Sequence, residues 1–469
     1  MTSPTRFAAI DLGASSGRVM IGEVAPDELR VTEAARFANR PVMLGDGLHW
    51  SVLSLFSAAL DGIAAATQEA PVMGIAVDSW AVDYGLLRRG SLLSVPYSYR
   101  DSRTERGLEL VDAVISQPEL YARCGLQRMP FTTINQLSVD RERGMLELAD
   151  SMLLLPDLFN YWMTGRAAIE RTNASTTGML ALDDSWDIEL MGMLGIDPGI
   201  LPRLVEPGTT IGPLLPQLRD HHGVHGDPQV FTVGSHDTAS AVVAAPLAEG
   251  AAYISSGTWS LVGIETPEPI ASGEAERANF TNEGGVDGRN RFMKNVMGMW
   301  LLSESKRTWE ADGSSVELPE LLSSAASYDR EVPIFDPTDD VFYAPGDMPT
   351  RIHRWFDERG IEPPEGRVAV TRCILESLAE AYAKTLQEIA RISGRPVTQV
   401  NVVGGGSQNS LLCQLTARRT GVPVFAGPIE ASAIGNLLVQ ARAAGVLAGT
   451  LEDLRELVSQ VYRPKRYDP

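Results

Sequence analysis

The order of apolar and polar positions along the chain indicates an α/β protein, most regularly in its last third. Apolar residues at three- and four-residue spacing predict a helix over 371–392. The apolar run 397–403 predicts a strand, followed by a helix over about 409–419, a strand over 422–426 and a helix over about 432–444. Such alternation of strands and helices predicts crossover units and a largely parallel sheet.

Earlier in the chain, a pattern of strand, Gly/Ser turn and strand occurs twice. The run at 7–12 ends in GASSGR before VMIGEV resumes a strand, and 251–263 repeats the pattern as AAYISSGTWSLVG. This repetition predicts two similar domains, each opening with a turn that holds phosphate, with a nucleotide between them. Single strands are also predicted at 72–77 and 230–233, and the start of an apolar helix at 292–302.

Composition excludes several classes of protein. The 469 residues carry 40 Lys and Arg against 60 Asp and Glu, a net charge of −20, with no basic stripe for duplex nucleic acid. No apolar stretch approaches a membrane span, and an acidic residue early in the chain argues against a signal peptide. The cysteines 124, 373 and 413 match no metal or redox spacing, which predicts buried thiols in a reducing cytoplasm and signals no structural metal.

The candidate chemistry lies where two buried strands end. Asp237 follows the strand at 230–233, and a turn containing Thr258 follows the strand at 251–255. A carboxylate can deprotonate an acceptor hydroxyl, while backbone N–H groups and a threonine hydroxyl hold the transferring phosphoryl group. Two structural alternatives stay open: Asp237 could cap the next helix, and SSGT could be an ordinary hairpin turn.

Two further glycine-rich turns can approach a ligand closely. The turn at 13–17 can present N–H groups to phosphate, with Arg18 adding a charge, and GGGSQN at 404–409 follows a strand. Neither a Walker A loop nor a GxGxxG fingerprint is present. Asp78 directly follows the strand at 72–77, which suggests the edge of a site, although Asp78 could simply cap a helix.

A set of characteristic segments runs along nearly the whole chain: IDLGASSGRVM, VDSWAVDYGLL, YRDSRT, GLQRMPFTTINQL, LLLPDLFNYWMTG, RTNASTTGML, SHDTASAV, AAYISSGTWSL, TNEGG, KNVMGMWLL, VVGGGSQNSLLCQL and AGPIEASAIGN. In these segments the chain resembles the FGGY carbohydrate kinases, and among them the kinases that phosphorylate L-rhamnulose. The resemblance implies an α/β fold of two ribonuclease H-like domains of the actin/hexokinase type, with mixed sheets flanked by helices. It implies a sugar-binding domain over 1–244, a nucleotide-binding domain over 245–469 and an active site in the cleft between them.

The resemblance also implies a reaction and its residues. ATP and L-rhamnulose would give ADP and L-rhamnulose 1-phosphate with Mg²⁺, and Asp237 matches the general base. The implied sugar contacts are His236, Asp237, Thr238, Asn295 and Ala81, where Ala81 stands in place of a glycine common in the family. The implied ATP contacts are Ala14, Ser15, Ser16, Gly17, Arg18, Thr258, Gly405 and Ser303, where Ser303 stands in place of a glutamine. Asp11 is similar to the acidic residue that reaches magnesium through water.

Three functional hypotheses follow from these residues. The first is an L-rhamnulose kinase, and the second is a kinase for another ketose, such as L-fuculose or L-xylulose, which Ala81 favours. The third is a nucleotide-dependent scaffold protein on the same fold, against which Asp237 argues, because an ATP switch needs no base beside an acceptor pocket. The expected partners are a sugar and ATP, without nucleic acid or membrane, and the expected state is a monomer or small homo-oligomer.

Overall fold

The computed structural model describes residues 3–313 and 315–469, and the chain divides into two compact units. The first unit contains Met1–Ala244, Glu265–Phe292 and Ala431–Val461. The second contains Ala245–Ile264, Met293–Glu430 and Tyr462–Pro469. The first unit therefore includes two segments from later in the chain in addition to the N-terminal part. The sequence had instead predicted contiguous domains over 1–244 and 245–469.

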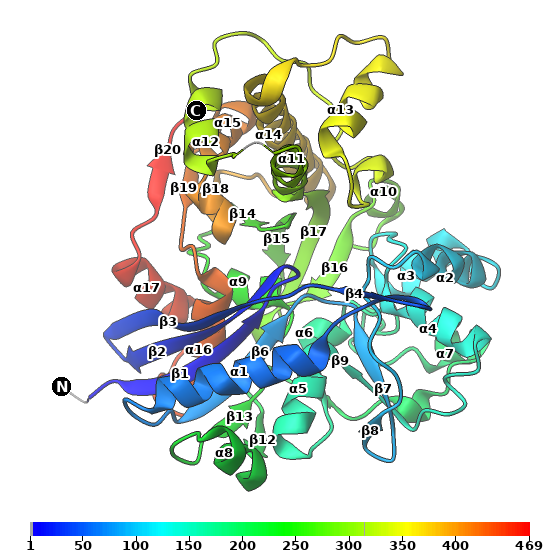
Figure 1. Ribbon diagram of the computed structural model, residues 1–469, viewed down its shortest axis with the longest axis vertical. Coiled ribbons are helices and arrows are strands. Elements are labelled where there is room, and N and C mark those ends of the chain that lie inside the picture. The colour runs from blue at the N-terminus through cyan, green and yellow to red at the C-terminus, as the bar shows by residue number, and fades with distance from the viewer. Residues whose placement is uncertain (1–2, 314) are drawn as a thin grey trace. The chain divides into compact units, whose positions relative to one another are not determined.

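A six-stranded mixed sheet forms the centre of the first unit, with the order β12-β13-β6-β1-β2-β3 (Figure 1). Its strands are β1 Thr5–Leu12, β2 Ser16–Ala25, β3 Glu28–Ala38, β6 Gly74–Ser79, β12 Thr210–Pro213 and β13 Gln229–Phe231. β1 pairs antiparallel with β2, as the strand–turn–strand pattern predicted, and β1, β6 and β13 run parallel. The carboxyl ends of these three parallel strands therefore meet at one edge of the sheet.

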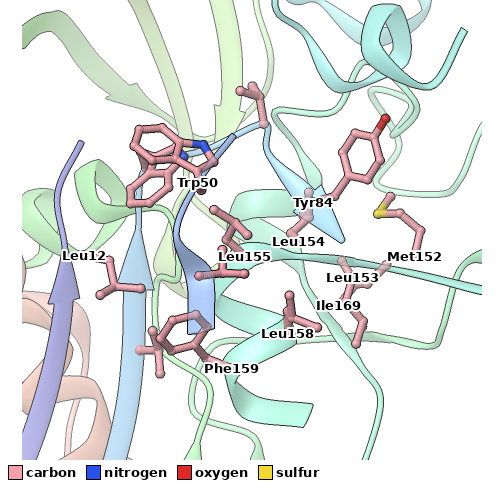
Figure 2. Packing of buried hydrophobic residues seen from close by; sticks show 14 of the residues in the cluster. Leu12, Trp50, Tyr84, Met152, Leu153, Leu154, Leu155, Leu158, Phe159 and Ile169 are labelled. Carbon is pink, nitrogen blue, oxygen red and sulfur yellow. The ribbon is translucent and has the colours of Figure 1, made fainter. Parts of the chain in front are cut away.

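Helices cover both faces of this sheet. Gly62 of α1 (Val52–Thr67) lies against Val19, whereas Gly22 lies against Leu437 of α16 (Ala431–Ala443). Residues 19 and 22 of β2 point to opposite faces because side chains alternate along a strand, so α1 and α16 pack on opposite faces. Figure 2 shows part of the core beside β1, where Leu12 lies in one buried cluster with Leu158 and Phe159 of α5 (Leu155–Thr164).

The remaining elements of the first unit are mostly short. They are β4 Val42–Leu44, β5 Gly47–His49, β7 Tyr84–Arg88, β8 Ser91–Leu92, α2 Arg103–Asp112, α3 Gln117–Cys124, α4 Thr133–Glu142, β9 Ser151–Leu154, β10 Ile169–Glu170, α6 Arg171–Ala174, α7 Ile188–Met193, η1 Pro198–Ile200, β11 Leu204–Val205, α8 Pro216–His222, α9 Asp237–Val243, α10 Gly273–Arg277, β16 Thr281–Gly284, η2 Val286–Gly288 and α17 Leu451–Val461.

A second mixed sheet has the order β16-β17-β15-β14-β18-β19-β20, and most of its strands belong to the second unit. The elements are β14 Ala251–Ser256, β15 Trp259–Thr266, β17 Asn290–Met297, α11 Trp300–Ala311, α12 Leu318–Ala326, η3 Asp340–Phe342, α13 Met348–Asp357, α14 Gly366–Ser393, β18 Gln399–Val403, η4 Gly405–Gln408, α15 Ser410–Thr420, β19 Val424–Ala426 and β20 Lys465–Tyr467. The predicted hairpin appears as β14 and β15, and β14, β18 and β19 run parallel as the alternation predicted.

One predicted element is wrong. The stretch 292–302 was expected to begin a helix, but β17 continues to Met297 and α11 begins only at Trp300. Apolar residues in this stretch fit either element, and pairing within the sheet decides in favour of the strand. Gly298 separates the two elements, where an added Cβ would lie 2.6 Å from the carbonyl carbon of Trp259.

The three cysteines are buried, as predicted. Burial raises the pKa of the Cys124 thiol to about 11 and the pKa values of Cys373 and Cys413 to about 12. Thiols with such pKa values stay protonated at neutral pH and are poor nucleophiles. Among residues 3–313 and 315–469, none of the helices combines the length and apolar character that crossing a membrane requires.

Candidate active site

Three acidic residues gather at the carboxyl edge of the first unit's sheet. Asp11 near the end of β1 is in register with Asp78 near the end of β6. Ser79, next along β6, forms a bridge with His236, which directly precedes Asp237. Parallel pairing therefore brings Asp11, Asp78 and Asp237 to one edge, although 226 positions separate the first from the last (237 − 11).

Asp237 is the most accessible of the three carboxylates. Its side chain is 31% exposed, and Asp237 is the first residue of α9. Loss of solvent raises the pKa of Asp237, the neighbouring His236 opposes this rise, and the negative charge of Asp11 adds to it. A carboxylate that is open to a ligand and more basic than usual can accept a proton from a hydroxyl group.

Asp11 contacts Arg18 of the predicted phosphate turn. Arg18 Nη2 donates to Asp11 Oδ2. The turn at 14–17, which lies between Asp11 and Arg18 in the chain, is held by Asn39. The Asn39 side chain donates to the Gly13 carbonyl at 2.9 Å, and the Asn39 N–H donates to the Ser15 carbonyl at 3.1 Å. The structure thus brings the predicted turn and Asp11 together and adds Asn39, which no motif in the sequence indicated.

Asp78 is a buried member of the site that the sequence only suggested as a site edge. It is fully buried, and Asn436 of α16 donates to its Oδ2 at 2.7 Å. Its Oδ1 has no hydrogen-bond partner among the described residues. Burial first, and then the charge of Asp11, raise the pKa of Asp78 well above its usual range. Asn436 comes from the AGPIEASAIGN segment and could not be connected with Asp78 before the fold was known.

Ala81 lies in a strained turn after β6. The Asp83 N–H donates to the Ala81 carbonyl at 2.9 Å, and Val82 between them has φ = 69°. This is a γ-turn whose positive φ is costly for a β-branched residue. Thr133 holds the turn by donating to the Val82 carbonyl at 2.7 Å. Strain of this kind is common at ligand sites, which is consistent with the predicted sugar contact at Ala81.

The carboxylate of Asp83 anchors the same turn. It accepts from the indole N–H groups of Trp50 at 2.6 Å and Trp80 at 2.9 Å, from Gln136 at 3.0 Å and from the Tyr99 N–H at 3.1 Å. Burial raises the pKa of Asp83 to about 6, although these four hydrogen bonds lower it. Four donors on one buried carboxylate hold the position of the turn at Ala81.

Glu170 supports the segment that precedes Asp237. It is fully buried, and its Oε2 accepts from the Ser235 N–H at 3.0 Å and the Ser235 hydroxyl at 2.6 Å. It also caps α6 by accepting from the Thr172 and Asn173 N–H groups. Burial raises the pKa of Glu170 despite these hydrogen bonds. Sequence reasoning missed Glu170, because only the fold brings residue 170 to residue 235.

Two sugar-contacting candidates of the first unit, His236 and Thr238, flank Asp237 in the chain and contact its carboxylate. His236 is buried, with Nε2 at 3.6 Å from Asp237 Oδ1, and the buried Thr238 donates to Asp237 Oδ1 at 3.1 Å. Asn295 belongs to the second unit, where it lies partly buried on β17. The roles of these residues toward a sugar stay predictions.

The second unit contains the predicted ATP contacts Thr258, Ser303 and Gly405. The Thr258 carbonyl in the turn between β14 and β15 accepts from the N–H groups of Gly298 and Trp300 at 3.2 Å each. Ser303 lies exposed on α11, and Gly405 lies exposed after β18. Around Gly405, Gly404 and Gly406 pack against Ser256, which places the GGGSQN segment beside the second predicted phosphate turn.

Gly406→Ala should displace this turn. An added Cβ would overlap Ser256 Oγ and lie 2.6 Å from Ser256 Cβ, so the end of β14 must move. We expect kcat to fall by about 10²-fold, because small displacements of a positioned phosphate site are costly. Measurement of ADP release under saturating substrates tests this expectation.

Gly405→Ala is the matched comparison for folding, since its Cβ would meet nothing within 4 Å. Both variants should be compared by thermal unfolding. Equal kcat values for Gly406→Ala and the wild type would show that the contact between Gly406 and Ser256 is not needed to position the predicted phosphate turn.

The family follows from comparison with known proteins. Residues 7–244 match the N-terminal domain and residues 252–444 the C-terminal domain of the FGGY family of carbohydrate kinases. The chain belongs to this family, so it is a carbohydrate kinase that uses ATP, as the resemblance implied.

Individual relatives show which carbohydrate kinases the chain is similar to. The chain is 39% identical to a rhamnulokinase from Bacteroides thetaiotaomicron, over 99% of this chain and 96% of the relative. It is 41% identical to a rhamnulokinase from Enterococcus faecalis, over 94% and 90% of the two chains. Among solved structures, xylulose kinase from Lactobacillus acidophilus has a TM-score of 0.80 at 15% identity, over 99% and 94% of the two chains. This last similarity confirms the α/β fold with mixed sheets.

Proposed function

We propose that this carbohydrate kinase transfers the γ-phosphoryl group of ATP to the C1 hydroxyl of L-rhamnulose. The observation that supports this proposal is the partly exposed Asp237 carboxylate at the carboxyl edge of the first sheet, beside His236. The near full-length similarity to rhamnulokinases supports the choice of sugar.

In the proposed reaction Asp237 accepts the proton of the C1 hydroxyl. The C1 oxygen then bonds to the γ-phosphorus of ATP, the bond from that phosphorus to the bridging oxygen breaks, and ADP leaves with the electron pair. Ala81, His236, Thr238 and Asn295 would orient the sugar. Positioning and charge neutralisation supply most of the catalysis in phosphoryl transfer.

The ATP phosphates would contact the two glycine-rich turns. The N–H groups of residues 14–17 and the Thr258 hydroxyl would hold phosphate oxygens, and Arg18 would add a positive charge. Ser303 and Gly405 would contact the nucleoside.

Mg²⁺ fits the acidic edge, because carboxylate oxygens are ligands that this hard cation prefers. The buried Asp78 Oδ1, which lacks a hydrogen-bond partner among the described residues, lies near Asp11 in the same edge. Among residues 3–313 and 315–469, no three His, Cys, Asp or Glu side chains are placed to hold a metal by themselves. The resemblance to the family implies that Asp11 would hold the ion through water. When bound, the ion would neutralise charge on the phosphates.

ADP release with Mg-ATP should be measured against L-rhamnulose, L-fuculose, L-xylulose, D-xylulose and glycerol. We expect kcat/KM for L-rhamnulose to exceed each of the others by about tenfold or more, since hydroxyl-specific sites discriminate strongly. Preference for L-fuculose or L-xylulose would support the second candidate function, which Ala81 favours because the resemblance implies a glycine at this position in the family. ADP release that does not depend on any of these sugars would contradict both candidate functions.

A further inference from the structure

Two buried serines flank the predicted phosphate turn of the second unit. Ser256 is the last residue of β14 and pairs with Ser260 of β15, so the two side chains lie on one face of the sheet. Both serines are buried, and Thr258 lies between them in the turn of the hairpin. A shift of either serine therefore moves the turn that would hold the ATP phosphates.

A tyrosine of the long helix α14 contacts the second of these serines. The Tyr382 hydroxyl lies 2.6 Å from Ser260 Oγ, and Tyr382 is 1% exposed. A phenol buried to this extent needs a hydrogen-bond partner, because its oxygen has lost water. Burial raises the pKa of Tyr382 to about 12, although the nearby hydroxyls of Ser260 and Ser256 lower it. The phenol is therefore protonated at neutral pH and can both donate and accept a hydrogen bond.

The first serine lies against the other glycine-rich segment of this unit. A Cβ on Gly406 would overlap Ser256 Oγ, so Ser256 packs directly on the GGGSQN segment. Ser256 Oγ has no hydrogen-bond partner among the described residues. The position of Ser256 therefore depends on its pairing with Ser260, and Ser260 is in turn held by Tyr382.

Backbone contacts hold a different part of the same turn. The Met299 N–H donates to the Gly257 carbonyl at 3.0 Å, and the Trp300 N–H donates to the Thr258 carbonyl at 3.2 Å. These two hydrogen bonds fix the tip of the turn, whereas Tyr382 fixes its base. A phosphate site needs both, because a turn that can tilt about its tip no longer presents its groups at a constant distance.

We infer that Tyr382 is a positioning residue for ATP, whose hydroxyl holds Ser260 and thereby fixes the base of the turn at Thr258 beside the GGGSQN segment. Packing alone does not account for the hydroxyl, because phenylalanine would fill the same space without a polar atom to bury. The inference rests on the proposed contact between this turn and the ATP phosphates. Tyr382 acts through Ser260, since it is itself buried.

Tyr382→Phe removes the hydroxyl and keeps the ring. We expect kcat to fall about tenfold and the affinity for ATP to fall about fivefold, because the phosphate site is displaced. The affinity for AMP and KM for the sugar should stay at their wild-type values, since AMP lacks the phosphates that the turn would hold. Calorimetry on the full-length protein and ADP release measure these quantities. Equal losses of affinity for ATP and AMP, or no loss for either, would overturn the inference.

Ser260→Ala tests whether Tyr382 acts through Ser260. The double variant Tyr382→Phe/Ser260→Ala should lose no more ATP affinity than either single variant. Losses that multiply would show that the two hydroxyls act independently, which would overturn the inference. If Tyr382→Phe does not fold, Ser260→Ala must by itself show the selective loss of ATP affinity, and wild-type affinity in that variant would overturn the inference.

Thr385→Val is the matched control for a buried hydroxyl on the same helix. The Thr385 hydroxyl donates to the Ala381 carbonyl within α14 at 2.8 Å, and Thr385 is buried. Its loss should leave the affinity for ATP unchanged. A loss equal to that of Tyr382→Phe would show that any buried hydroxyl of α14 has this effect, and would overturn the inference.

Thr258→Val separates this inference from the proposed function. Weakened ATP binding in both Thr258→Val and Tyr382→Phe would support both. Weakened binding in Thr258→Val with wild-type binding in Tyr382→Phe would overturn the role of Tyr382 alone. Wild-type ATP binding in Thr258→Val would contradict the phosphate role of the turn and would overturn the inference with it.

Discussion

Asp237→Asn should lower kcat by about 10² to 10⁴-fold, the usual contribution of a general base. The amide keeps the size of the side chain but cannot accept the proton of the sugar hydroxyl. Sugar and ATP should therefore still bind, which calorimetry on the variant can measure beside ADP release. Turnover near the wild-type value would rule out Asp237 as the base.

The pH dependence of kcat/KM in the wild-type enzyme is a second test of the proposed role of Asp237. Only the ionised carboxylate can act as a base, so kcat/KM should fall as the pH decreases through the pKa of Asp237. Because burial and Asp11 raise that pKa, activity should be lost at a higher pH than an ordinary aspartate would give. In Asp237→Asn the residual activity should lack this dependence.

Gly435→Ala should destabilise the first unit by about 3 kcal/mol, at the upper end of overpacking effects. Gly435 lies on α16 where this helix crosses α9, and an added Cβ would overlap the Ser240 carbonyl oxygen and lie 2.7 Å from its carbon. A backbone atom cannot rotate away as a side chain can, so α9 must move. Since Asp237 begins α9, kcat should fall together with the unfolding temperature.

The control for this variant is Gly192→Ala. Gly192 lies in α7, and its Cβ would meet nothing within 4 Å, so alanine should be neutral or slightly stabilising there. Denaturant unfolding and ADP release should be measured for both variants. Equal stability of Gly435→Ala and the wild type would show that α9 and α16 can separate without cost.

The sequence predicted secondary structure correctly where a local pattern is compatible with only one kind of element. Apolar runs and glycine-rich turns predicted β1 with β2, β14 with β15, and the parallel strands β18 and β19. The motif around Asp237 indicated its place after a strand, and its role as a base stays a prediction. The error at 292–302 arose because an apolar stretch is compatible with either a strand or a helix until its neighbours are known.

By itself, the sequence determined the α/β class, the hairpins with their turns, the position of Asp11 near the end of a strand and the position of Asp237 after one, because these depend on local patterns. Only the tertiary structure decided that Asp78 lies beside Asp11 with Asn436 on its carboxylate, that Glu170 holds Ser235, and that Tyr382 meets Ser260. These contacts join residues that are 65 to 358 positions apart (235 − 170 and 436 − 78). Burial then makes each contact strong and shifts the pKa values of the carboxyl groups, which no local pattern encodes.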